Sequence, residues 1–70
     1  MQSTANKISV IIPLYNKRES IARAITSALT QSPAPREVIV VDDGSTDGSG
    51  EVVEALAAEH PTIKLIHQEN

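Results

Sequence analysis

Cysteine, phenylalanine and tryptophan are absent from the sequence, and Tyr15 is its single tyrosine. Without cysteine, the chain can form neither a disulfide framework nor a thiolate metal site. Hydrophobic residues still make up 40% of the chain, so a core has to be built from Ile, Val, Leu and Ala. That share is typical of a folded segment, and 70 residues allow one small domain or a piece of a larger one.

Long hydrophobic runs and clusters of basic charge are also missing. The longest apolar runs, Val10–Leu14 and Val38–Val41, are far too short to span a bilayer. The polar start Met1–Lys7 lacks the apolar stretch of a signal peptide. Six basic and nine acidic residues give a net charge of −3, without the basic patch of a nucleic-acid-binding protein. We therefore expect a cytoplasmic protein that binds no nucleic acid. A position at the cytoplasmic face of the membrane stays open for the full-length protein.

The hydrophobic periodicity predicts three strands that alternate with two helices. Short β-branched runs predict strands over Ile8–Pro13, Glu37–Asp42 and Ile63–His67. Apolar residues at helical spacing predict one helix that begins at Arg18 and another over Glu51–His60. The polar and glycine-rich segments 14–17 and 43–50 are expected to be loops.

This alternation predicts an α/β fold with a parallel sheet. If the strands step in one direction across the sheet, both helices cover the same face and the other face stays bare. Strand alternation divides the aliphatic residues of the first two strands into two sets, one for each face. The first set is Ile11, Ile39 and Val41, and the second is Ile8, Val10, Ile12, Val38 and Val40. Lys64 indicates that the third strand lies at an edge.

Polar residues follow the first two predicted strands, in the segments Pro13–Asn16 and Asp42–Ser49. Ligands of open parallel sheets bind outside the carboxyl ends of the strands, and neighbouring strands lie about 5 Å apart. The two segments should therefore be neighbours. A lone aromatic ring beside two carboxylates fits a nucleoside site, and backbone N–H groups at the following helix start offer a place for a phosphate.

The segment Ser9–Asn16, SVIIPLYN, is followed after about twenty residues by Glu37–Ser49, EVIVVDDGSTDGS. The two motifs together resemble the family-2 glycosyltransferases of the GT-A fold, and the resemblance extends from Ile8 to the end of the chain. It implies the βαβαβ half of a Rossmann-like GT-A domain, a three-stranded parallel sheet with helices on one face. Residues 1–70 would be a partial nucleotide-sugar-binding domain, truncated before the metal-binding and acceptor regions.

The resemblance assigns seven residues to the substrate site: Pro13, Tyr15, Asn16, Asp42, Asp43, Gly44 and Ser45. Pro13 and Tyr15 match the loop that packs around the nucleotide base. Asp43 matches the carboxylate that contacts a uracil-type base, and Asp42 matches an acid near the base or ribose. Asn16 and the last two residues of the set match the turns that shape the site.

The implied reaction is transfer of a sugar from a nucleotide diphosphate, most often UDP, to a hydroxyl acceptor with inversion at the anomeric carbon. The family's downstream Asp-x-Asp, which holds Mg²⁺ or Mn²⁺ on the diphosphate, has no counterpart here, nor have the catalytic base and the acceptor site. No catalytic residue or metal ligand is therefore assigned, and we expect these 70 residues alone to be inactive. Family members make polysaccharides, glycolipids and modified proteins, and the motifs do not distinguish among them. The alternative is a non-catalytic nucleotide-binding or assembly module. Under either interpretation, we expect the isolated chain to self-associate through the bare sheet face or the edge of the first strand, or else to fold only marginally.

Simpler interpretations exist for several of these residues. Asp47 is expected to cap the second helix, because Asp is favoured at that position. For Asp43 nucleotide contact is favoured over a turn role, and for Asp42 the two interpretations are evenly weighed. Tyr15 has the alternative of a packing role.

Other ligand classes fit the sequence less well. Residues 13–18 contain no glycine for a dinucleotide-binding turn, and no Gly-Lys pair exists for a P-loop. The pattern from Asp43 to Glu54 satisfies an EF-hand calcium loop, but it follows a predicted strand rather than a helix. His60 and His67 are interpreted as structural or exposed, because neither has a partner at ligand spacing.

Overall fold

The computed structural model describes residues 8–32 and 34–69. Its elements are β1 (Ser9–Leu14), α1 (Arg18–Leu29), β2 (Glu37–Asp43), α2 (Ser49–Glu59) and β3 (Ile63–Gln68). The order is the predicted one, while the polar start Met1–Lys7 lies outside the described residues. In the part of the chain that is described, no helix is long and apolar enough to cross a membrane.

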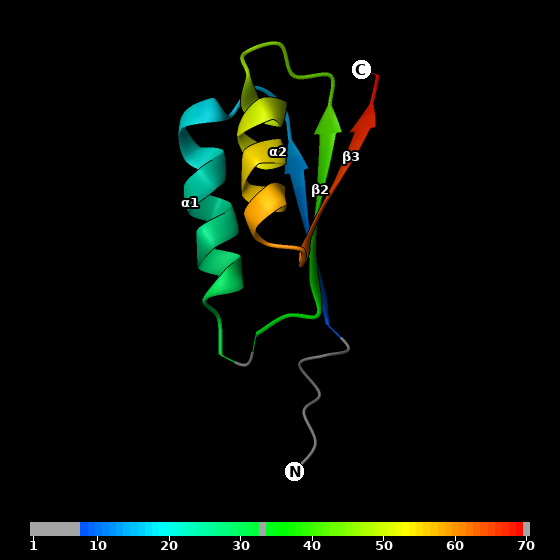
Figure 1. Cartoon of the computed structure of the whole chain (residues 1–70). Coiled ribbons are helices and arrows are strands. Elements are labelled where there is room, and N and C mark those ends of the chain that lie inside the picture. Colours follow the sequence, from blue (N-terminus) through cyan, green and yellow to red (C-terminus); the bar gives the residue numbers. More distant parts are fainter. Residues whose placement is uncertain (1–7, 33, 70) are drawn as a thin grey trace.

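The three strands form one parallel sheet in the order β1-β2-β3. Both helices lie side by side on one face of this sheet, and the opposite face carries neither (Figure 1). The predicted βαβαβ fold with helices on one face is confirmed. Within the described residues β1 and β3 are the edge strands, as expected for the strand that contains Lys64.

The helix-facing side of the sheet carries the core. Val38 and Val40 of β2 are fully buried, and their partners Val10 and Ile12 of β1 pack against the core. Ile63 of β3 is also buried there. Val10, Ile12, Val38 and Val40 thus share one face, as predicted, and the structure shows that this is the covered one. Ile8, the fifth member of that set, precedes β1 and is half exposed.

The other side of the sheet, called the open face below, is lined by Ser9, Ile11, Pro13, Glu37, Ile39, Val41, Asp43, Lys64, Ile66 and Gln68. Ile11 is 64% exposed and Ile66 is 48% exposed. Ile39 and Val41, in the central strand, are half-buried between their neighbours. Ile11, Ile39 and Val41 thus share one face, as predicted, and the structure shows that this is the uncovered one (Figure 1).

The helices pack through the apolar residues at helical spacing. Ile21, Ile25 and Ala28 of α1 are buried, whereas residues 23, 26 and 27 are exposed. Val53 of α2 is fully buried, and Leu56 lies partly buried beside it. Aliphatic side chains alone fill this core, as the composition requires.

Several boundaries differ from the prediction in ways that affect the site. The strands β2 and β3 each extend one residue beyond the predicted end, to Asp43 and Gln68. Leu14 was expected in a loop but ends β1, where its side chain is 1% exposed and packs under the helices. An edge strand tolerates Pro13, which has no N–H group to donate, so the strand continues past it. The helix α2 begins at Ser49 rather than Glu51, because Gly48 at φ 90° turns the chain directly into the helix.

Candidate functional site

Two loops follow the carboxyl ends of β1 and β2, and reciprocal hydrogen bonds join them. The Asn16 N–H donates to Ser45 Oγ at 2.9 Å, and the Thr46 N–H donates to Asn16 Oδ1 at 2.8 Å. Asn16 has φ 49°, a left-handed conformation that asparagine tolerates better than most residues. The polar groups of Asn16 and Ser45 are therefore used to hold the loops together.

The same connection continues into the helix starts. The Lys17 N–H donates to the hydroxyl of Ser49, a fully buried residue, at 3.1 Å. Asp47 accepts the Arg18 N–H at 3.1 Å and the Ser49 N–H at 2.9 Å, and also the Ser49 hydroxyl. We call the hydrogen bonds between residues 16–18 and residues 45–49 the loop interlock.

The predicted capping role of Asp47 is wrong in its position. Gly48, not Asp47, occupies the N-cap of α2. Asp47, one residue before this cap, accepts the N–H groups of Arg18 and Ser49, which are the first residues of α1 and α2. The Ser49 hydroxyl, followed by the N–H groups of Arg18 and Ser49, lowers the pKa of Asp47 below its ordinary value of 3.8. These donors favour the charged carboxylate. They are also occupied, so they are not free for the phosphate contact suggested by the sequence.

The adjacent acids Asp42 and Asp43 point to opposite faces of the sheet, because successive side chains of a strand alternate. Asp42 is 4% exposed on the helix side, and its Oδ1 accepts the Ser45 N–H at 3.0 Å. Asp43 lies on the open face. The structure therefore separates the two carboxylates that the sequence grouped, and Asp42 stabilises the turn that begins at Gly44.

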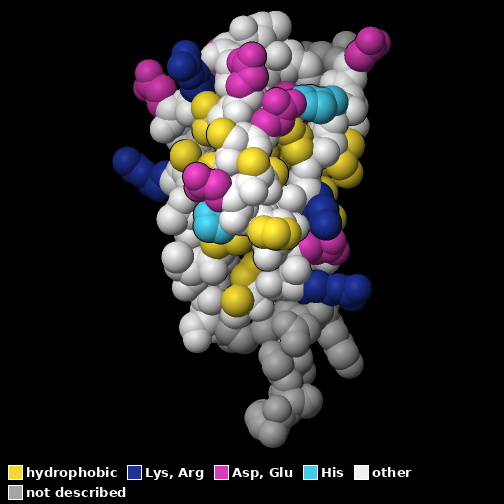
Figure 2. All heavy atoms as spheres, in the orientation of Figure 1, with side chains coloured by type: hydrophobic (Ala, Val, Ile, Leu, Met, Phe, Trp, Pro, Cys, Tyr) yellow, Lys and Arg dark blue, Asp and Glu magenta, His cyan; other side chains and the backbone are white. Residues whose placement is uncertain are grey.

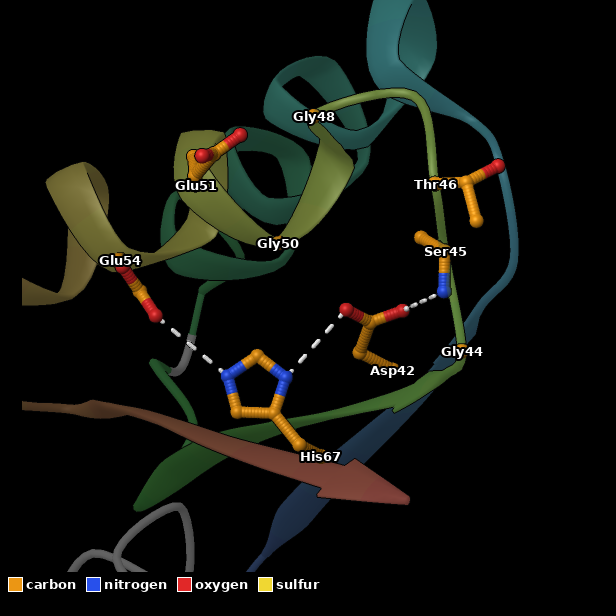
Figure 3. A pocket seen from close by; sticks show the side chains of 9 residues that line it. All are labelled: Asp42, Gly44, Ser45, Thr46, Gly48, Gly50, Glu51, Glu54 and His67. Carbon is orange, nitrogen blue, oxygen red and sulfur yellow. Dashed lines mark hydrogen bonds and ion pairs between the residues drawn. The ribbon is translucent and has the colours of Figure 1, made fainter. Parts of the chain in front are cut away.

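His60 and His67 are exposed, in agreement with the interpretation from the sequence, but His67 has partners that the spacing did not indicate. Its Nδ1 lies 3.5 Å from Asp42 Oδ2, and its Nε2 lies 3.5 Å from Glu54 Oε2 (Figure 3). Strand pairing places His67 directly opposite Asp42, and α2 brings Glu54 to the other ring nitrogen. Figure 2 shows acidic side chains beside a histidine near the carboxyl end of the sheet. No sequence spacing could indicate this group, because three separate elements supply it.

Gly50 lies against this group. A Cβ atom at Gly50 would lie 2.7 Å from Asp42 Oδ2 and 3.3 Å from His67 Cε1. Real Cβ contacts are almost never as short as the first of these distances. Glycine therefore allows α2 to approach the buried Asp42 carboxylate.

A pocket at the carboxyl edge of the sheet is lined by Pro13, Leu14, Tyr15, Lys17 and Asp43, of which Pro13 and Asp43 lie on the open face. Tyr15 is 48% exposed, so its ring is accessible to a ligand. The structure thus brings together Pro13, Tyr15 and Asp43, three residues assigned to the site from the sequence. Lys17, which the sequence did not single out, adds a cation. An aromatic ring, a carboxylate and an ammonium group within one pocket can stack, accept hydrogen bonds and attract an anion.

Among the described residues, no three His, Cys, Asp or Glu side chains are placed to hold a metal ion. The residues of the EF-hand pattern do not converge. Asp43 lines the pocket on the open face, whereas Asp47 binds the helix N-termini. The loop also follows β2 rather than a helix, as the sequence argument required.

Comparison with known proteins gives one family. The family model described as glycosyl transferase family 2 matches residues 9–70. The uncharacterized glycosyltransferase YibD of Escherichia coli K12 is 41% identical over 70 residues, which are 100% of this chain and 20% of that protein. The uncharacterized glycosyltransferase alr2836 of a Nostoc species is 48% identical over 65 residues, 91% of this chain and 20% of that protein. Chondroitin synthase of Escherichia coli is 40% identical over 63 residues, 90% of this chain and 9% of that protein.

Proposed function

Since this chain belongs to glycosyltransferase family 2, we propose that it forms the nucleotide-binding part of an enzyme that transfers a sugar from a UDP-sugar to a hydroxyl acceptor with inversion. The chain spans about a fifth of the length of the first relatives it matches, so the activity of the whole enzyme is part of this proposal. The chondroitin synthase among the relatives is in keeping with a role in making a polysaccharide or another cell-envelope glycan.

The observation that carries the proposal is the joint presence of Tyr15 and Asp43 in one pocket at the carboxyl edge of the sheet. This edge is where open α/β sheets bind their ligands. The exposed ring of Tyr15 offers a stacking surface for a base, and the Asp43 carboxylate accepts a hydrogen bond from a base N–H. Pro13, which lies on the open face, also lines this pocket.

The other four residues assigned from the sequence hold the two loops that carry this pocket. Asn16 and Ser45 bind each other's loops, and Asp42 holds the turn through the Ser45 N–H. Gly44 has φ 79°, which only glycine adopts readily. In the proposal these four residues place Tyr15 and Asp43 rather than contact the nucleotide. Lys17 supplies positive charge for the phosphates.

A divalent metal on the diphosphate is part of the family's chemistry, and Mg²⁺ or Mn²⁺ is proposed for the whole enzyme. The described residues do not fit it, because they bring no suitable set of ligands together. We assign the metal ligands, the catalytic base and the acceptor site to parts of the enzyme other than these residues.

Titration with UDP, followed through the backbone amides by NMR, tests the proposal. We expect affinity no better than about millimolar, or roughly −4 kcal/mol, because this chain is assigned the base and ribose side of the site but not the metal that would hold the diphosphate. The amides of residues 14–16 and 43–45 should shift first. Shifts confined to residues 63–67 would place the nucleotide elsewhere.

The variant Asp43→Ala should abolish the response to UDP, because it removes the acceptor for the base. Its matched control is Glu59→Ala, which also removes one negative charge but from the exposed end of α2. The control should bind UDP like the wild-type chain. Equal binding by both variants would refute the role of Asp43.

A further inference from the structure

Gln68 ends β3 on the open face, directly opposite Asp43 in the pairing of β2 with β3. Its side-chain Nε2 lies 3.5 Å from Asp43 Oδ1, and the residue is exposed. The sequence motifs gave Gln68 no role. The strand pairing nevertheless places its amide beside the one carboxylate that lines the pocket of Tyr15.

The contact between Gln68 and Asp43 is long for a hydrogen bond, so both groups remain able to bind another partner. A carboxylate only accepts hydrogen bonds, whereas an amide nitrogen donates two. The Asp43 carboxylate therefore favours the orientation in which Nε2, rather than Oε1, faces it. In this orientation the pair offers an acceptor and a donor side by side.

Uracil carries the complementary pattern along one edge, where the N3–H donor lies between two carbonyl acceptors. Proteins that bind unpaired bases read such edges by hydrogen bonds while an aromatic side chain stacks on the ring. At the sheet edge, Asp43 can accept the N3–H while Gln68 donates to the neighbouring carbonyl. Tyr15, which follows the end of β1, supplies the ring.

We propose that Gln68 is a specificity-determining residue that donates a hydrogen bond to a carbonyl oxygen of the uracil-type base held by Asp43. This inference rests on the proposed nucleotide site and extends it across all three strands. It assigns to the end of β3 a direct contact with the ligand.

The test uses the wild-type chain and the variant Gln68→Met, which keeps the side-chain length and removes the amide donor. Each is titrated with UDP and with its 2-thio and 4-thio analogues, in which sulfur, a weaker acceptor, replaces one base carbonyl oxygen. Gln68→Met should weaken UDP binding about three- to tenfold, the range for one hydrogen bond. One of the two analogues should bind the wild-type chain more weakly than UDP by a similar factor, and the variant should bind that analogue and UDP equally.

Lys64→Met is the control, because Lys64 lies on the same face of β3 at the opposite end of the strand. It should leave the preference for UDP over the analogues unchanged. If Gln68→Met weakens UDP and both analogues by the same factor, Gln68 only supports Asp43 and the inference fails. Unchanged UDP affinity in Gln68→Met would also overturn it. A wild-type chain that does not bind UDP would overturn the proposed function itself, a separate result because that titration needs no variant.

Discussion

At the scale of single residues, the polar side chains of the two loops divide into two groups. Asn16, Ser45 and Asp47 direct their oxygen atoms at backbone N–H groups of the opposite loop or helix. Tyr15 and Asp43 instead line a pocket that is open to solvent. The first group fixes the backbone that carries the second, so substitutions in the two groups should have different effects on stability and on binding.

Asp47 should make stability depend on pH. Its pKa is lowered by the fold, so its contribution is fully present above the ordinary value of 3.8 and is lost as the pH falls through the lower folded value. In Asp47→Asn this contribution is missing. Urea denaturation should therefore show the variant to be less stable than the wild-type chain at about pH 6, with a smaller difference at about pH 3.

Glu59→Gln is the comparison for this measurement, because Glu59 is an exposed acid at the far end of α2. Its difference from the wild-type chain should be small at both pH values. If Asp47→Asn behaves like Glu59→Gln, the hydrogen bonds of Asp47 contribute nothing to folding.

At the scale of the elements, the contact between α2 and β2 depends on Gly50. Replacing glycine by alanine within a helix normally stabilises it by up to about 1 kcal/mol. Here the added Cβ would press on the Asp42 carboxylate, and overpacking of this kind costs about 1–3 kcal/mol. We expect Gly50→Ala to lower the free energy of unfolding by about 1 kcal/mol on balance.

Urea denaturation measures this change, and the amide shift of Ser45 reports whether Asp42 has moved, because that amide donates to its carboxylate. Ala58→Gly, at an exposed position of the same helix, gives the size of the ordinary propensity effect. If Gly50→Ala is more stable than the wild-type chain, the Asp42 carboxylate moves away from the added Cβ without loss of folding free energy, and the prediction is wrong.

The elements could be predicted from the sequence because their signals are local. The stripe of α1, for example Ile21 and Ile25, and the β-branched run of β2 each identify their element without knowledge of the rest. The end of β1 could not be predicted in this way. Whether Leu14 belongs to the strand depends on its burial under the helices, which is not a local signal.

The candidate site was predictable only in part. The motifs indicated Tyr15 and Asp43, which the structure places in one pocket. They did not indicate the partners of His67 or the position of Gln68, because both follow from the pairing of β2 with β3 rather than from spacing along the chain. Asp42 and Asp43 lie on opposite faces because successive residues of a strand alternate. The motif grouped the two acids, so it did not indicate this separation.

At the scale of the whole molecule, the open face is the feature that favours self-association, because it exposes large apolar side chains. Ile11 and Ile66 are about half exposed or more, and side chains of this kind each gain about 1.5–3 kcal/mol when fully buried. Exposed apolar patches of this type mark interaction surfaces or aggregation sites. The edge of β1 adds a row of backbone groups that can pair with another strand. We predict that the 70-residue chain self-associates through this face or edge, or else folds only marginally.

Sedimentation at increasing concentration, together with chemical denaturation, measures both outcomes. Ile11→Lys should shift the chain towards the monomer, whereas Thr26→Lys, on the exposed side of α1, should not. A wild-type chain that stays monomeric at high concentration and unfolds cooperatively with several kcal/mol of stability would contradict the prediction.

The loop interlock also has a consequence for the order of events in folding. Asn16 and Ser45 are 29 positions apart, so their hydrogen bond can form only after α1 has carried β2 alongside β1. Contacts that close late contribute little to the transition state, and their loss mainly speeds unfolding. In stopped-flow experiments, Ser45→Ala should therefore raise the unfolding rate and leave the refolding rate nearly unchanged. The loops that carry Tyr15 and Asp43 would then be the last parts of the molecule to form and the first to open.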